Sequence, residues 1–160
     1  MPAPVAASIT PKTLTVSGLT VAASKVYDGT TAAVVTNTGV LAGIIGTDAV
    51  AIGGTAVGLY NSKDVASANA VSFAGLTLSG TDARNYALAA PSPVAATITR
   101  ASLTVTANAD ARFVTQTDAT GFNGVSYAGF VGGENSSVLG GALAISRTAH
   151  FSGSTGSRPG

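Results

Sequence analysis

Hydrophobic and polar residues alternate along much of the first hundred residues with a period of two. Leu14 and Val16, for example, are interleaved with threonine and serine. This period is typical of half-buried β-strands, whereas an amphipathic helix would repeat every 3.6 residues. The pattern predicts strands with little helix, at residues 13–17, 19–26, 32–36, 50–59, 71–78, 94–99 and 103–107.

Turn-forming residues separate these predicted strands. Asp28-Gly29 can supply the positive φ of a tight turn, and Asn123-Gly124 has the same capacity later in the chain. Gly53-Gly54 predicts either a turn or a β-bulge. Residues 81–85 (TDARN) are expected to form one helical turn or a capped loop, with Thr81 or Asp82 as the cap.

The sequence also repeats itself. Residues 8–17 (SITPKTLTVS) align with residues 97–106 (TITRASLTVT) at an offset of 89. Residues 42–48 (AGIIGTD) align with residues 128–134 (AGFVGGE) at an offset of 86. A repeat of this length is a small domain, because one coil of a β-helix is several times shorter.

We therefore predict an all-β chain of two tandem small modules, β-grasp-like or sandwich-like, of which the second is incomplete. The predicted boundaries are residues 1–11 for the end of a preceding module or a linker, 12–99 for the first module, 100–151 for the truncated second module and 152–160 for a disordered tail.

Composition restricts the function classes. Charged residues make up 9% of the chain and the net charge is +1, so there is no basic stripe for nucleic acid. The 46% hydrophobic content favours a folded chain over a disordered one. No cysteine is present, which excludes disulfides and cysteine-based zinc sites. We expect no membrane span, and an export signal, if there is one, upstream of residues 1–8.

Catalytic and metal-binding residues are scarce. The single histidine, His150, has no acidic neighbour in sequence with which to build a triad. Two carboxyls across a cleft would suit a glycosidase, but Asp48 and Glu134 are repeat equivalents, and duplicated positions favour an architectural role. No closely spaced Asp and Asn series resembles a calcium loop. We predict no enzyme activity, no cofactor and no metal.

Two stretches carry a family resemblance. Residues 25–31 (KVYDGTT) resemble the opening of the YDG-type repeat of filamentous-haemagglutinin-like bacterial exoproteins, and residues 76–86 (LTLSGTDARNY) resemble its closing stretch. From Ser102 onward the chain resembles the mostly-β-grasp (MBG-like) module. It departs from that pattern at Phe113, the repeat equivalent of Tyr27, where tyrosine is usual, and at Val114-Thr115, where Gly-Asp is usual.

The resemblance implies a large secreted adhesin of the bacterial cell surface, exported by two-partner secretion, with no catalytic activity. In it these modules would form a stalk or spacer in adhesion or biofilm, with neighbouring repeats of the same polypeptide as partners. The residue types themselves predict that Tyr27 packs in the core and that Asp28 with Gly29 forms a structural turn, in preference to a metal or sugar site at Asp28. The alternative is a module that binds host or matrix glycans or proteins through the loop Asp82, Arg84, Asn85 and Tyr86.

Overall fold

The structure is a computed structural model that describes residues 1–108 and 124–141. Within these ranges the chain consists of eleven strands and two single turns of 3-10 helix, with no α-helix. The predicted all-β class is confirmed. None of the described helices is long or apolar enough to cross a membrane.

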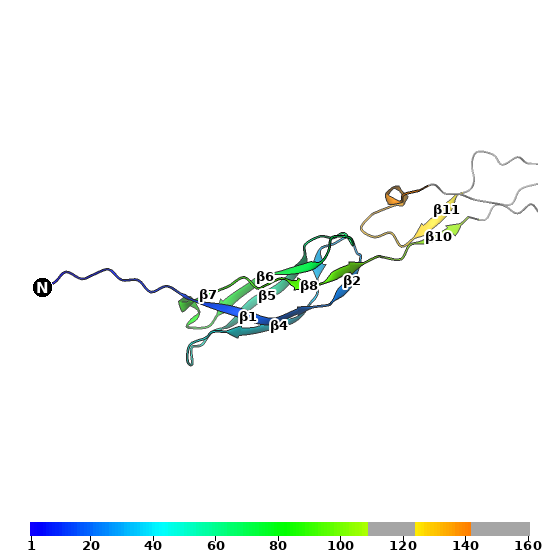
Figure 1. Cartoon of the computed structure of the whole chain (residues 1–160). Helices are drawn as coiled ribbons and strands as arrows, with labels where there is room; N and C mark the ends of the chain where they lie inside the picture. The colour runs from blue at the N-terminus through cyan, green and yellow to red at the C-terminus, as the bar shows by residue number, and fades with distance from the viewer. Residues whose placement is uncertain (109–123, 142–160) are drawn as a thin grey trace, which may run out of the picture.

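The first module forms two layers of strands. One sheet has the order β4-β1-β7, in which β1 (Lys12–Val21) pairs antiparallel with β4 (Val35–Ala42) and parallel with β7 (Tyr86–Leu88). The other sheet is antiparallel throughout, and its strands are, in order, β3 (Ala32–Ala33), β5 (Ala51–Tyr60), β6 (Ala70–Ser79) and β8 (Val94–Ala95). Figure 1 shows β1 and β4 along one side of the module and β5 and β6 along the other. We expected either a β-grasp-like or a sandwich-like module, and the two layers formed by residues 12–99 are sandwich-like.

The second sheet is built on a long hairpin. The hairpin consists of β5 and β6, which pair antiparallel from Ala51 opposite Ser79 to Tyr60 opposite Val71. A separate parallel pair joins β2 (Ser24–Val26) to β9 (Thr97–Thr99). This pair brings the last strand of the module beside one of its first.

The core is small and lies between the layers. Leu14 and Val71 are its fully buried large side chains. A cluster at the β2–β9 end contains Tyr60, Ala68, Val71, Ala96 and Ile98. Ile98 is 2% exposed while its neighbours Thr97 and Thr99 are exposed, so β9 shows the expected alternation.

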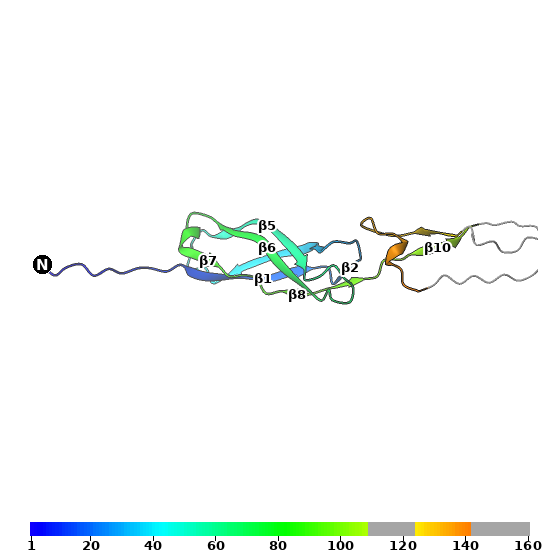
Figure 2. The ribbon, with the colours of Figure 1, turned by 90° about the horizontal axis from the view of Figure 1, so that it is seen from above.

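The second module begins at the opposite end of the first module from the N-terminal segment (Figures 1 and 2). Its described part holds β10 (Thr104–Ala107) paired antiparallel with β11 (Val125–Ala128), and a short turn, η2 (Ser136–Val138). The predicted tail, residues 152–160, lies outside the described residues, as do Phe113, Val114, Thr115 and Asn123.

Several predicted strand limits are wrong. Gly18 does not interrupt β1, because β4 pairs on both sides of it, and the break comes after Val21. The predicted strand 32–36 is divided, and its second part runs on to Ala42. The predicted strand 94–99 divides at Ala96, because β8 pairs with β6 whereas β9 pairs with β2. The sequence analysis did not predict the short strands β7 and β11, because three or four residues are too few to show an alternation of apolar and polar side chains.

Gly53-Gly54 lies inside β5, and the register with β6 shifts between Gly54 and Val57. The bulge interpretation therefore holds. Across the hairpin, Gly75 has φ +79°, and a Cβ there would overlap the backbone oxygen of Thr55. The two strands approach so closely here that only glycine fits.

We expect Gly75→Ala to lower the free energy of unfolding by about 3 kcal/mol, because the methyl group adds a backbone clash to the cost of a positive φ. Gly46→Ala is the matched control. Gly46 has φ +54°, and a Cβ added there would meet nothing within 4 Å, so this change carries only the conformational cost of about 1 kcal/mol. Urea unfolding of both variants measures the difference. Equal losses would contradict the close approach.

Candidate functional site

The Tyr-Asp-Gly motif forms the turn between β2 and β3. Asp28 Oδ1 accepts hydrogen bonds from the backbone N–H and the hydroxyl of Thr30, both at 2.9 Å. Gly29 has φ +77°. The structure thus places Asp28 and Gly29 in a tight turn, which the Asp28 carboxylate stabilises through its hydrogen bonds from Thr30.

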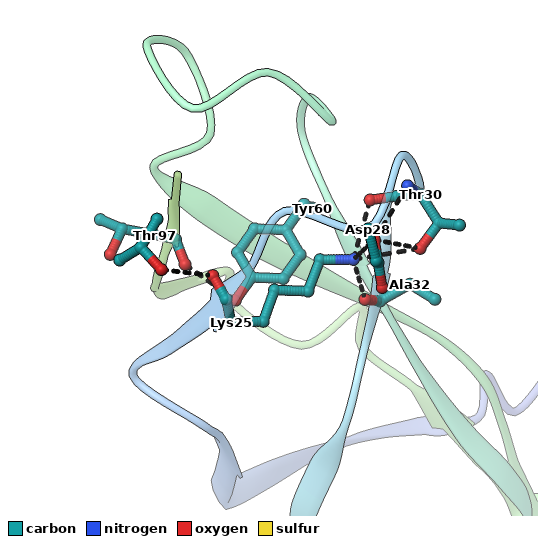
Figure 3. Close-up of polar contacts among 7 residues, drawn as sticks. Lys25, Asp28, Thr30, Ala32, Tyr60 and Thr97 are labelled. Carbon is teal, nitrogen blue, oxygen red and sulfur yellow. Dashed lines mark hydrogen bonds and ion pairs between the residues drawn. The ribbon is translucent and has the colours of Figure 1, made fainter. Parts of the chain in front are cut away.

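Lys25 organises this turn from inside the module (Figure 3). Its Nζ donates to Asp28 Oδ1 at 2.8 Å, to the Thr30 carbonyl at 2.8 Å and to the Ala32 carbonyl at 2.9 Å. The side chain is 18% exposed, and Nζ lies 5.5 Å from the centre of the Tyr60 ring. Three charge-assisted contacts and a cation–π contact compensate the partial desolvation of the ammonium group.

Sequence reasoning did not assign a role to Lys25. In β2 the alternation runs against hydropathy, because Val26 is 60% exposed while the lysine points inward. The available signal is its place three residues before Asp28 in a chain with few charges.

The Lys25 ammonium group holds the pKa of Asp28 at about 2, below the ordinary value of 3.8, and the hydrogen bonds from Thr30 act in the same direction. The ionised carboxylate is therefore the form that the folded turn favours.

Tyr27 faces the second module. Its backbone N–H donates to the Thr99 carbonyl at 2.8 Å, and its ring packs half-buried against the core cluster. Its hydroxyl donates to Glu134 Oε1 at 2.6 Å. This hydrogen bond, together with partial burial, raises the pKa of Tyr27 above 10.0. Tyr27 thus combines packing against the core cluster with a polar contact to the next module.

A groove of about 420 Å³ lies at this junction. The first module contributes Tyr27, Asp64 and Val65 to its lining, and the second contributes apolar side chains that include Phe130, Val131 and Leu139. Its walls therefore come from both modules.

A second polar cluster lies at the other end of the first module. The Tyr86 hydroxyl donates to Asp48 Oδ2 at 2.6 Å and accepts from the Ile45 N–H at 3.1 Å. Asp82 Oδ2 accepts from the Ala49 N–H at 2.8 Å. Tyr86 is 7% exposed, and the hydrogen bond to Asp48 and burial raise its pKa.

These contacts divide the loop that we considered for glycans. Asp82 and Tyr86 are both bound to the loop of residues 45–49, so they tie β7 to the rest of the module. The expected helical turn is η1 (Ala83–Asn85), with Asp82 at its N-cap position but without a side-chain capping bond. Arg84 and Asn85 line a groove of about 350 Å³ beside Ile9, Thr10 and Pro11.

Side chains that could ligate a metal do not gather in the described chain. Among residues 1–108 and 124–141, no three side chains of the types His, Cys, Asp and Glu come together. His150 lies outside these ranges.

The lowered pKa of Asp28 predicts that the stability of the turn is sensitive to acid. Its folded pKa lies below the unfolded value, so it stabilises the module fully above pH 3.8, and this contribution is lost as pH falls from 3.8 towards 2. We expect Asp28→Asn to be less stable than the parent at pH 6 and to approach it at pH 2. Urea unfolding at both pH values tests this.

In a Lys25→Met variant, the NMR titration of Asp28 should move up towards 3.8. An unchanged titration would show that Lys25 does not set this pKa.

Comparison with known families bears on the same elements. Residues 10–95 match the YDG domain, a range that covers β1 to β8 and includes both the Tyr27-Asp28-Gly29 turn and the Tyr86 cluster. No curated protein and no solved structure matches the chain. Because the match spans more than half of the 160 residues, the chain belongs to the YDG domain family.

Proposed function

We propose that the chain is a non-catalytic spacer segment of a large secreted bacterial adhesin of the filamentous-haemagglutinin type, exported by two-partner secretion. In this proposal the YDG unit and the MBG-like module that follows are successive units of a stalk at the cell surface. Family membership supports the assignment of the first unit as a YDG domain, and the internal sequence repeat at offsets of 86 and 89 supports a tandem organisation. The structure contributes the way in which the two modules meet.

The observation that carries the proposal is the junction between the two modules, which combines a short linker with a hydrogen bond beside it. Only residues 100–103 separate β9 from β10, which leaves little freedom for the second module to turn. The Tyr27–Glu134 hydrogen bond then joins the two modules beside that linker. A hydrogen bond to an ionised acceptor is shorter and stronger than one between neutral groups, so this contact favours one orientation of the second module.

The use of carboxylates supports the same proposal. Asp28, Asp48 and Asp82 each accept hydrogen bonds that hold a turn or a loop of the first module. Glu134 holds the junction. In a chain with only seven acidic residues, these side chains have architectural partners.

A second candidate function rests on Arg84. Within the described residues its side chain makes no hydrogen bond or ion pair. With Asn85 it lines the groove at the N-terminal end of the module. A guanidinium and an amide at the rim of a groove suit a glycan or an acidic matrix protein.

The spacer proposal predicts a fixed distance across the junction. Nitroxide labels at Thr47→Cys and Ser137→Cys, both exposed in the described chain, can be placed selectively because the parent has no cysteine. We expect pulsed electron paramagnetic resonance to give a narrow distance distribution. Tyr27→Phe should broaden it, because the variant loses the donor to Glu134 and keeps the ring.

Glu134→Gln is the matched control, since its amide oxygen still accepts a hydrogen bond from Tyr27. Its distribution should stay closer to that of the parent than the distribution of Tyr27→Phe. A parent distribution as broad as that of Tyr27→Phe would contradict a stiff junction.

The alternative function predicts specific binding on a glycan array. If Arg84 carries it, Arg84→Ala should reduce binding about tenfold or more, which corresponds to the loss of one charge-assisted contact. Lys63→Ala, a change at another exposed cation of the first module, should leave binding unchanged. The spacer proposal expects no specific binding by the parent chain.

A further inference from the structure

The N-terminal segment repeats the sequence of the two closing strands. Residues 2–10 (PAPVAASIT) align with residues 91–99 (PSPVAATIT) at the offset of 89. Only Ala3 and Ser8 differ, with serine and threonine as their equivalents. The aligned range contains both β8 and β9.

The two copies have opposite environments. In the first copy Val5 is 91% exposed and Ile9 is 100% exposed. The equivalent of Ile9 is Ile98, which is 2% exposed in the core cluster. Within the described chain, residues 2–10 belong to no strand. The segment thus has the apolar pattern of the closing strands, but its apolar side chains are not packed against a module in the described chain.

The closing strands are held through backbone atoms that residues 2–10 also possess. In the first module Ala96 N–H donates to the Asn69 carbonyl and Thr97 N–H donates to the Ala23 carbonyl, at 3.3 and 3.1 Å. The Thr99 carbonyl accepts from the Tyr27 N–H at 2.8 Å. None of these bonds uses a side chain of the closing strands, so the two sequence differences do not affect them.

We propose that residues 2–10 are the closing strand pair of another YDG unit, whose other strands correspond to residues 12–90. The partner is therefore a second copy of the β1–β7 body. In it Ile9 fills the place of Ile98, Val5 takes the place of Val94, and the segment pairs with the equivalents of β6 and β2. The proposal rests on the tandem organisation in the proposed function.

The loop at that end of the module supports a neighbouring unit there. Ile45 is the repeat equivalent of Val131, which lines the junction groove, and Asp48 is the equivalent of Glu134, which binds Tyr27. Ile45 is 55% exposed. The N-terminal end of the first module thus carries an apolar and an acidic residue at the positions that the second module uses to contact the first.

The experiment adds the missing body to the full chain. A second copy of residues 12–90 replaces Met1 and leads directly into Pro2, which reproduces the native Ala90-Pro91 connection. Hydrogen exchange is then followed by NMR at Ala7 and Ser8, the equivalents of Ala96 and Thr97. We expect their exchange to slow at least about 100-fold relative to the parent chain, because both amides become paired in a folded unit.

Two variants of the extended chain test the register. Ile9→Asp should abolish the protection, because its equivalent Ile98 is buried, while the resident module 12–99 stays folded. Ala6→Asp is the matched control. It adds the same charge at a position whose equivalent, Ala95, is exposed, so protection should persist.

Unprotected Ala7 and Ser8 in the extended chain would overturn the proposal. It would also fail if protection appeared only after Ala3→Ser and Ser8→Thr, which make residues 2–10 identical to residues 91–99. Equal effects of Ile9→Asp and Ala6→Asp would refute the register. The distance measurement between residues 47 and 137 does not involve residues 2–10, so a failure here is distinguishable from a failure of the spacer proposal.

Discussion

The parallel pairing of β2 with β9 is the constraint on which the rest of the structure depends. It puts Ile98 into the core and lets the Tyr60 hydroxyl donate to the Thr97 carbonyl at 3.2 Å. It also fixes Thr99 against the backbone of Tyr27. Because the chain leaves β9 at this point, the exit to the second module lies beside Tyr27. The pairing that closes the module therefore also determines where the next one begins.

The distribution of polar groups follows from the small core. Small aliphatic side chains make up most of the core, together with the buried rings of Tyr60 and Tyr86, and the strongly polar contacts lie at the two ends. At one end Lys25 binds Asp28 and two carbonyl groups, and at the other Tyr86 binds Asp48. A partly buried charge is costly unless its hydrogen bonds are satisfied. In the described residues no buried side-chain nitrogen or oxygen lacks a partner.

Local sequence predicted the strand-rich class, the two long strands at residues 50–59 and 71–78 and the Asp28-Gly29 turn, because these depend on neighbouring residues. Parallel pairs such as β2–β9 and β1–β7 join residues more than seventy positions apart, and no local period reports them. The inward Lys25 was missed for a different reason, because hydropathy favours an outward position for a lysine. Its carbonyl partners lie only five and seven residues further along the chain, whereas the fold brings the Tyr60 ring beside it. The glycan loop was proposed from residue types, whereas tertiary contacts engage Asp82 and Tyr86.

The repeat equivalence of Asp48 and Glu134 acquires a physical meaning from their partners. Each accepts a tyrosine hydroxyl at 2.6 Å, but Asp48 receives it from Tyr86 of its own module and Glu134 from Tyr27 of the preceding one. A carboxylate has about four acceptor sites. Asp48 binds Tyr86 through Oδ2, which leaves Oδ1 with capacity for a second donor. One acidic position therefore has the acceptor capacity to bind a tyrosine of its own module and a tyrosine of a neighbouring module at the same time.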